Sequence, residues 1–459
     1  MISQSLATFI RELDSEHIAS GINSDHLRNL FVDTLVCAVA GSVGPGATSV
    51  IGAYSGLSDV EHASIICREK KAAVPTAALV NTFLARNYTF DDIFEGGVIH
   101  SGASVIMSAL AVGEWLNSRI KDFLAGAIGG YEIASRVAMA MNPSHYSKGF
   151  HPTGTCNTVG VAAAASKLLE LDVKGIESAM NLAADGACGF RQYQLDGNII
   201  NSAFHAAKAA ETGIMAALLA KNGFPGPGNA IDGEFGLLHC MSDKFDEKTL
   251  IGGLGSDFLF MDSSLKPYPS CRYMHGAVDA TARCKRENGI SVLDIDKIDI
   301  STFHMAFAEG NRPRPSNTLD AQFSIHYNIA VYLLEDRITV NDFSNQAIAR
   351  DEVLSLCDKI NVHEEVALSK KYPEQWPFRA EIILKDGKRY SSESLYPPGS
   401  ALNPLSEEEL LKKWESLVED VIGKKRGHNL LEVLRAIYSF QTVREFVLEV
   451  RKILLPGCV

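Results

Sequence analysis

The sequence predicts a two-domain protein, with a mainly α-helical domain built from both chain ends and a smaller α+β domain inserted before the last helices. Three observations lead to this prediction. Apolar residues recur at helical spacing through most of residues 1–266, short runs typical of strands follow in 267–404, and helical spacing returns in 405–459. A chain of 459 residues, of which 46% are hydrophobic, is long enough to bury two cores.

The larger domain is predicted to be a bundle of helices that are buried on many sides. An amphipathic helix opens the chain in MISQSLATFIRELDSEH, and a second is expected over residues 24–41, with a cap at Ser24 or Asp25 and a stop at Gly41. Further helices are expected over residues 103–116, 119–141, 157–170, 174–188 and 202–222. Several of these ranges are rich in Ala and Gly, which lets neighbouring backbones approach closely.

The smaller domain is predicted from a change in pattern after the segment SSLKPYPSCRYMHG. Strands are expected within residues 291–304 and 379–394, the second range folding back on itself through a Lys-Asp-Gly turn. A helix is expected between them, over residues 326–336. Helical structure then resumes after Ser406, which can cap a helix with an acidic first turn, and continues to residue 459.

Charge and cysteine usage exclude several functional classes. Lys and Arg number 43 against 55 Asp and Glu, so the net charge of −12 leaves no basic footprint for nucleic acid or an anionic membrane. No stretch reaches about 18 uninterrupted apolar residues, and the N-terminus lacks the pattern of a signal peptide. The nine cysteines are odd in number and scattered, which is typical of reduced, buried thiols in a cytoplasmic protein.

Motifs that would indicate a bound nucleotide, a zinc ion or a serine triad are absent. The sequence has no P-loop, no strand–GxGxxG–helix arrangement, no CxxC or HExxH, and no GxSxG. We therefore expect a protein that uses no cofactor and no metal.

Polar residues gather in three stretches and at the domain junction. They are Asp91, Asp92 and His100 in NYTFDDIFEGGVIHSG; His145, Tyr146, Lys148 and His151 in NPSHYSKGFHPTGTCN; Arg191, His205 and Lys208 in RQYQLDGNIINSAFHAAKAAETG; and Lys266, Arg272 and His275 in KPYPSCRYMH. Each group has a plain structural alternative. The two aspartates can cap a helix, an isolated histidine is often a core residue, and a helical lysine often lies at the surface. Together, in an acidic protein, they favour a pocket for a di- or polycarboxylate with proton-transfer groups.

These residues lie in segments that resemble the MmgE/PrpD family, which includes 2-methylcitrate dehydratase, cis-aconitate decarboxylase and iminodisuccinate epimerase. The matching segments occur in family order along nearly the whole chain: DTLVCAVAGS, FDD with HSGASVIMSALAVGE, KGFHPTGTCNTVGVAAAASKLL, FHAAKAAETGIMAALLAKNGFPGP, LKPYPSCRYMHGAVDA, AQFSIHYNIAVYLLEDR and PPGSALNPLSEEEL. The resemblance implies a helical domain formed by both chain ends, residues 1–266 and 405–459, and an α+β domain of residues 267–404. It further implies a cofactor-free active site between the domains and a homodimer.

The chain departs from the family at several polar positions. In the dehydratase and decarboxylase branch the frame is similar to D-F-D-D-T followed by HP[ST], whereas here Thr89 and Ile93 replace the outer Asp and Thr and a longer spacer leads to His100. A lysine three residues before the helical His205 is replaced by Ser202. Lys208 is kept as a cation where the family more often shows Arg. The family positions that match are His100, His151, His275 and Tyr327.

The departures favour a different reaction on a related scaffold, because dehydration and decarboxylation need a positioned acid that the Asp, Thr and Lys set supplies. Epimerisation needs one group to remove the proton α to a carboxylate and another to return it on the opposite face. We therefore expect a cofactor-independent epimerase of a small polycarboxylate, similar to iminodisuccinate epimerase. A lyase of the 2-methylcitrate dehydratase or cis-aconitate decarboxylase type is the first alternative, and a non-catalytic carboxylate-binding protein the second.

Roles for the candidate residues follow from this hypothesis. The expected catalytic residues are His151, Lys208 and His100 as bases, with Tyr327 and Tyr146 as hydrogen-bond donors. The expected substrate-binding residues are Lys266 and Arg272 as carboxylate clamps, with His275, Asp92, Arg191 and His205. A metal site at Asp91, Asp92 and His100 is disfavoured, because adjacent carboxylates on a helix or strand point apart.

Overall fold

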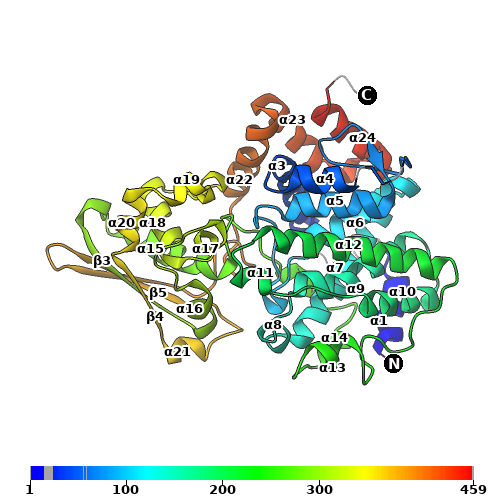
Figure 1. Cartoon of the computed structure of the whole chain (residues 1–459), viewed down its shortest axis with the longest axis horizontal. Coiled ribbons are helices and arrows are strands. Elements are labelled where there is room, and N and C mark those ends of the chain that lie inside the picture. The colour runs from blue at the N-terminus through cyan, green and yellow to red at the C-terminus, as the bar shows by residue number, and fades with distance from the viewer. Residues whose placement is uncertain (1, 15–23, 55, 58, 457–459) are drawn as a thin grey trace.

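The structure is a computed structural model that describes residues 2–14, 24–54, 56–57 and 59–456, and it combines many helices with one small mixed sheet (Figure 1). The helices built from the first half of the chain and from its C-terminal end form one body, while the sheet and its own helices project to one side. This agrees with the predicted combination of helical and α+β parts. The residue bounds of the two domains stay a prediction.

The helical body is formed mainly by long helices whose small residues allow close packing. They are α1 (Ile2–Glu12), α3 (Ser24–Gly41), α5 (Val74–Arg86), α6 (Gly102–Leu116), α7 (Ile120–Met141), α9 (Pro152–Leu168), α10 (Val173–Asp185) and α12 (Ile200–Lys221). At the crossing of α7 and α9, a Cβ atom on Gly130 would lie 2.5 Å from the carbonyl oxygen of Gly160. Only glycine permits this approach, so the Gly-rich pattern of α7 is a packing requirement.

Most predicted helices appear within a few residues of their expected ends, with two exceptions. The helix expected over residues 157–170 begins earlier, at Pro152, because proline fits the first turn of a helix, where its missing N–H is not needed. The opening amphipathic helix ends at Glu12, and the end of its predicted range lies outside the described residues. The range of α5 was not among the helices named from the sequence, although helical spacing was predicted for most of residues 1–266; Arg86 at its end lines the site described below.

The C-terminal helices return to the helical body and complete its core. They are α22 (Glu407–Ile422), α23 (Lys424–Arg435) and α24 (Val443–Leu454), and α22 begins with the predicted cap at Ser406. Leu35 of α3, Leu417 of α22 and Phe446 of α24 belong to one apolar cluster. The predicted helical structure at residues 457–459 lies outside the described residues.

A buried ion pair joins these helices to the loop after α5. The Lys413 ammonium lies 2.6 Å from Asp33 Oδ1 and donates a hydrogen bond of 3.0 Å to the carbonyl oxygen of Phe90. Trp414 donates from its indole nitrogen to the same Asp33 oxygen at 2.9 Å. One lysine therefore ties α22, α3 and residue 90 together.

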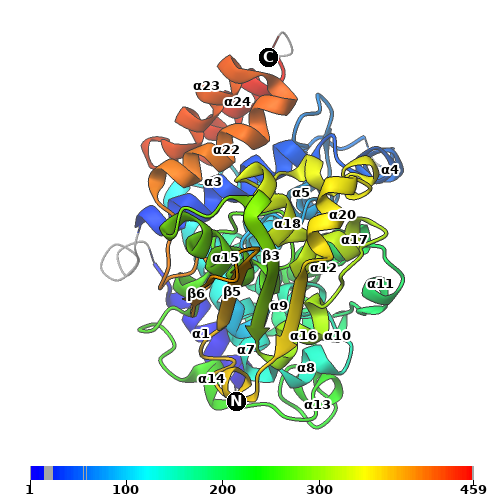
Figure 2. The same cartoon turned by 90° about the vertical axis from the view of Figure 1, so that its left-hand side faces the viewer.

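The projecting part is built around a four-stranded sheet in the order β4-β3-β5-β6. β3 (Ile295–Thr302) pairs in parallel with β4 (Ile360–Glu364) and antiparallel with β5 (Phe378–Leu384), which forms the predicted hairpin with β6 (Arg389–Ser394). In the view of Figure 2, β3 and β5 lie side by side in front of the helical body. Helices α15 (His275–Glu287) and α18 (Ile325–Glu335) share a separate apolar core with these strands.

The environment of the cysteines differs in part from the prediction. Each of the eight cysteines in the described ranges is free, but Cys188 and Cys240 are exposed rather than buried. Cys188 lies in the segment that follows α10, and Cys240 lies on a short helix, α13 (Leu237–Met241), whose buried residues are Leu237 and Leu238. Cys458 lies outside the described residues.

Within the described ranges, no helix combines the length and the apolar character that a bilayer span requires.

The close approach of α7 and α9 leads to a prediction about stability. Replacing Gly130 with Ala places a methyl group against the Gly160 carbonyl, so we expect the free energy of unfolding to fall by about 2 kcal/mol or more. The control is Gly52→Ala in α4 (Ala47–Tyr54), where a Cβ atom meets nothing within 4 Å and helix propensity favours Ala by up to about 1 kcal/mol. Urea unfolding of both variants measures the difference, and equal stabilities would contradict the assigned contact.

Candidate active site

A pocket of about 480 Å³ lies where the helical body meets the sheet-bearing part. Its walls come from the end of α5 and the following loop, the starts of α6 and α9, the short helices α8 (Ser144–Ser147) and α11 (Gln192–Leu195), and residues 266–273. The lining residues are Arg86, Thr89, Ile93, Val98, His100, Tyr146, His151, Tyr193, Gln194, Ile199, Lys266, Cys271, Arg272, Tyr273, Phe323 and Trp376. Three of them carry cationic groups, two are histidines, and none is a carboxylate.

Lys266 lies fully buried against the loop after α5. Its ammonium nitrogen donates a hydrogen bond to the carbonyl oxygen of Thr89, a residue held in the left-handed region with a φ of 58°. Burial, together with the nearby Arg86 guanidinium, lowers the pKa of Lys266 to about 7. Lys266 is thus able to give or accept a proton near neutral pH.

His100 is held as a neutral base by a backbone carbonyl of the same loop. Its Nδ1 atom lies 2.6 Å from the carbonyl oxygen of Asp92. Because a carbonyl oxygen can only accept, Nδ1 carries the proton and Nε2 keeps its lone pair. Burial, and then the charges of Arg86 and Lys266, hold the pKa of His100 well below its usual value.

Asp91 and Asp92 do not line the pocket, and they have different partners. Asp91 forms an ion pair of 2.9 Å with Arg86, whereas Asp92 accepts from the Tyr131 hydroxyl and, at 3.4 Å, from the backbone nitrogen of Gly102 at the start of α6. Burial raises the pKa of both carboxyls, and the charges of Asp91 and Asp33 raise that of Asp92 further. A proton held by the pair therefore resides on Asp92.

The positions of Asp91, Asp92 and His100 show which of the three belongs to the pocket. The aspartates form the frame of the loop, and His100 alone of the three lines the pocket. Across the described ranges, no group of three or more His, Cys, Asp and Glu residues is placed to hold a metal ion.

A pair of histidines forms a second wall. His151 precedes Pro152 as the N-cap of α9, and its Nδ1 atom lies 3.2 Å from Nδ1 of His205 on α12. One of these nitrogens must donate to the other, and the Tyr193 ring contacts both imidazoles edge-on. Burial and the neighbouring His205 hold the pKa of His151 well below its usual value.

The two arginines proposed for carboxylate binding already hold protein partners. Arg272 donates from Nε to Glu95 at 2.7 Å and from Nη1 to the carbonyl oxygen of Pro398 at 2.7 Å. Arg191 lies over the Tyr146 ring and donates to Glu309 at 2.5 Å. Arg272 lines the pocket, whereas Arg191 supports the lining residue Tyr146 from behind.

The structure brings some of the predicted residues together and leaves others apart. The predicted residues that line the pocket are His100, Tyr146, His151, Lys266 and Arg272. The predicted residues that contact a lining residue without lining the pocket are Asp92, Arg191, His205 and His275. Lys208 pairs with Glu211 on α12 and its side chain is 36% exposed, while the Tyr327 hydroxyl donates to the carbonyl oxygen of Asp342 at 2.5 Å. Neither Lys208 nor Tyr327 lines the pocket.

Several lining residues were not singled out from the sequence. They include Arg86, Tyr193, Gln194, Cys271 and Trp376. Arg86 is the basic residue at the C-terminal end of α5, where basic residues are favoured in any helix, so its position gives no sign of a pocket. Trp376 is distant in sequence from the other lining residues, and only the packing of the sheet-bearing part brings it to the pocket.

Two buried hydrogen-bonding groups of the lining have no partner. They are Nε of Arg86 and the hydroxyl of Thr89. Leaving such a group unpaired in a protein interior costs about 1–3 kcal/mol, so a bound molecule with acceptor oxygens is expected to complete them.

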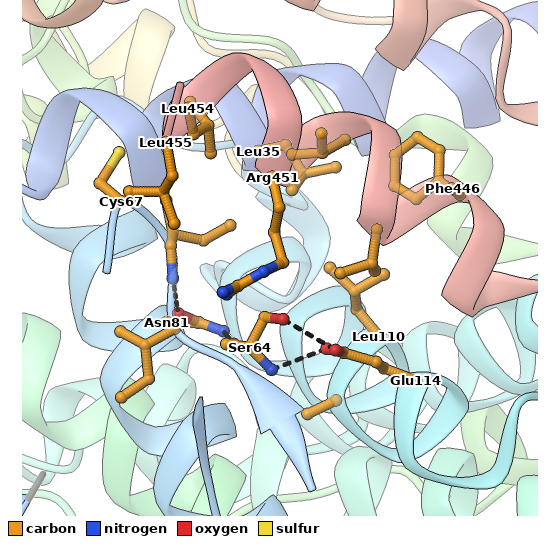
Figure 3. Close-up of a pocket in the computed structure, with 15 residues that line it drawn as sticks. Leu35, Ser64, Cys67, Asn81, Leu110, Glu114, Phe446, Arg451, Leu454 and Leu455 are labelled. Carbon is orange, nitrogen blue, oxygen red and sulfur yellow. Dashed lines mark hydrogen bonds between the residues drawn. The ribbon is translucent and has the colours of Figure 1, made fainter. Parts of the chain in front are cut away.

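A second pocket, of about 450 Å³, has a different character (Figure 3). There Glu114 accepts from the backbone nitrogen and the hydroxyl of Ser64, both at 2.7 Å, and Asn81 donates to the Ser64 carbonyl and accepts from the Ile66 nitrogen. Arg451 of α24 donates to two backbone carbonyls nearby. Because these polar groups are satisfied and the remaining wall is largely apolar, this pocket is a packing seam between α24 and the helical body.

Comparison with known proteins identifies the family. Residues 4–250 match the MmgE/PrpD N-terminal domain, and residues 268–437 match the MmgE/PrpD C-terminal domain. The chain belongs to the MmgE/PrpD family. This MmgE/PrpD protein is 25% identical to cis-aconitate decarboxylase of Homo sapiens over 466 residues, covering 96% of this chain and 92% of that protein. It is 23% identical to cis-aconitate decarboxylase of Aspergillus terreus over 441 residues, or 89% of each chain. It is 24% identical to 2-methylcitrate dehydratase of Escherichia coli O157:H7 over 418 residues, covering 84% and 83%.

The buried Lys266 of this MmgE/PrpD protein gives a pH-dependent prediction. Its pKa of about 7 lies below the value near 10.4 of an unfolded lysine, so the unfolded state binds one more proton between these values. The cost of burying Lys266 is therefore fully present below about pH 7 and is lost as the pH rises toward 10. We expect Lys266→Met to stabilise the protein most at about pH 6, and the gain to shrink by roughly 1 kcal/mol per pH unit above pH 7.

Urea unfolding of the two proteins between about pH 6 and pH 9.5 measures this difference, because groups distant from residue 266 contribute equally to both. The control is Lys208→Met. Burial lowers the pKa of Lys208, but the ion pair with Glu211 outweighs it and raises the pKa overall, so Lys208 stays protonated in both states over this range and its difference should be flat. A flat difference for Lys266→Met would contradict the assigned pKa.

Proposed function

We propose that this protein is a lyase that acts on a small polycarboxylate by proton transfer at a carbon α to a carboxylate. The observation that supports this most is the composition of the pocket lining, in which Arg86, Lys266 and Arg272 are cationic and no residue is acidic. The unpaired Nε of Arg86 and the unpaired hydroxyl of Thr89 are donors suited to carboxylate oxygens.

The same pocket contains a matched acid and base. Nε2 of the neutral His100 can accept a proton from the α-carbon, and Lys266 can supply one as an ammonium group near neutral pH. In an elimination, the electron pair of the broken C–H bond forms the double bond, and the leaving hydroxyl takes a proton from Lys266. In a decarboxylation, the carbon–carbon bond breaks, and the electron pair left on the α-carbon takes that proton.

The relatives support a lyase reaction, since their names describe a decarboxylase and a dehydratase that act on cis-aconitate and 2-methylcitrate. Both reactions pass through charge that develops at a carbon next to a carboxylate. Cationic groups in a water-poor pocket stabilise such charge strongly.

An epimerase is the second candidate, and the position of Ile93 favours it. The side chain of Ile93 lines the pocket where the resemblance implies a threonine in the lyase branch. His100 and His151 approach the pocket from the starts of two different helices, which suits proton removal and return on two faces of one carbon. An iminodisuccinate-like polycarboxylate is the corresponding substrate class.

Reaction in deuterated water distinguishes the candidates. The panel consists of cis-aconitate, 2-methylcitrate, iminodisuccinate and unsaturated or hydroxylated dicarboxylates, followed by NMR. Loss of water or carbon dioxide supports the lyase, whereas deuterium at the α-carbon with loss of stereochemical purity and no loss of mass supports the epimerase. Binding of these acids with no turnover of any would indicate a non-catalytic binding protein and contradict both.

The acid and base assignments predict the effect of pH on catalysis. We expect kcat/KM to decrease as the pH rises above 7, because Lys266 loses its proton. On the acid side we expect it to decrease only well below pH 6.5, where His100 gains a proton. A pH profile that keeps rising through pH 8 would show that ammonium Lys266 is not the acid.

Replacement of His100 tests the base directly. We expect His100→Gln to lower kcat by about 10²–10⁴-fold, the usual contribution of a general base. The control is His304→Gln, because His304 is an exposed residue of α16 (His304–Gly310) that is paired with Glu364 and does not line the pocket. If His100→Gln keeps wild-type kcat, the assignment of His100 is wrong.

A further inference from the structure

The segment between Ile93 and His100 forms a tight turn at one end of the pocket. Phe94 and Ile99 exchange backbone hydrogen bonds, and the turn between them contains a short helix, η1 (Glu95–Gly97), and Val98 with a φ of 50°. This geometry directs the Glu95 side chain toward Arg272. The Glu95 carboxylate accepts from Arg272 Nε at 2.7 Å and from the Ser264 hydroxyl at 2.5 Å.

The donors of Arg272 are almost all occupied by the protein. Nε is bound to Glu95, Nη1 contacts the Pro398 carbonyl and Nδ1 of His275, and Nη2 contacts the Pro397 carbonyl. A guanidinium has five N–H groups, so a single one is left for a ligand. Arg272 therefore cannot bind a substrate carboxylate through two parallel hydrogen bonds, which is the arrangement that makes arginine an effective carboxylate clamp.

A wider groove of about 1230 Å³ continues from this end of the pocket. Trp376 lines both the groove and the pocket, and Glu95 lines the groove together with Asp262 and Glu374. Burial and the charge of Glu95 raise the pKa of Asp262. The outer side of Arg272 is therefore acidic, in contrast to the rest of the pocket wall.

We propose that Glu95 takes the place of a substrate carboxylate at Arg272, so that the site prefers a small dicarboxylate to a tricarboxylate. This inference rests on the proposed function, which places a polycarboxylate in the pocket, and it makes the substrate class narrower. Arg86, Thr89 and Lys266 remain to bind the two carboxylates of such a ligand. A third carboxylate directed at Arg272 would lie close to the Glu95 carboxylate. Two neighbouring negative charges repel strongly in a partly buried site.

The test compares two ligands that differ by one carboxylate. Glutarate has the carbon chain and the terminal carboxylates of tricarballylate but lacks its central carboxylate. Isothermal titration at neutral pH and low salt gives Kd for both ligands with the wild-type protein, with Glu95→Gln and with Glu374→Gln. Glu95→Gln keeps the size of the side chain and an acceptor oxygen. Glu374→Gln removes the same charge from the same groove, where Glu374 is exposed and Glu95, rather than Glu374, is paired with Arg272.

We expect wild type to bind glutarate at least as tightly as tricarballylate, and Glu95→Gln to shift the ratio of the two Kd values by roughly tenfold toward tricarballylate. Glu374→Gln should leave the ratio within about twofold of wild type. An unchanged ratio in a folded Glu95→Gln protein would overturn the role of Glu95 and leave the proposed function standing. Failure of wild type to bind either ligand would overturn the proposed function and this inference with it.

Discussion

The pocket depends on a buried ammonium group that the C-terminal part of the chain supplies. Lys413 on α22 holds Asp33 of α3 and the carbonyl oxygen of Phe90 at once, with little access to water. Removing one partner of a buried ion pair leaves an uncompensated charge, which is strongly destabilising. The loop that carries the site therefore requires helices from both ends of the chain, and this requirement gives a physical reason for the interrupted order of the helical body.

Three backbone carbonyl groups of that loop hold side chains from other parts of the site. The carbonyl of Thr89 accepts from Lys266, that of Phe90 accepts from Lys413, and that of Asp92 accepts from His100. The left-handed conformation of Thr89 helps to turn these groups in different directions. Each carbonyl can only accept, so the loop determines which nitrogen of His100 carries the proton and keeps Lys266 at the pocket wall.

Local patterns in the sequence were sufficient to predict much of the fold. Helical spacing predicted α6, α7 and α12, and the Ser406 cap predicted the start of α22, because these features depend on neighbouring residues. The five-residue strand β4 was missed, since so short a run has little periodicity and is fixed by its pairing with β3. In the site, polar composition indicated His100, His151 and Lys266. It gave no indication of Arg86 or Trp376, whose roles as walls arise from contacts between distant segments.

Because backbone carbonyls hold Lys266 and His100, the positions of these two side chains do not depend on which side chains the loop itself carries. The side chains of residues 89 and 93 form part of the pocket surface, whereas the peptide oxygens of Thr89 and Asp92 hold Lys266 and His100. The loop therefore uses its backbone to position the two side chains and its own side chains to shape the pocket surface. Thr89 and Ile93, which occupy the pocket wall here, show how reactions could diverge within one scaffold through the least disruptive kind of change.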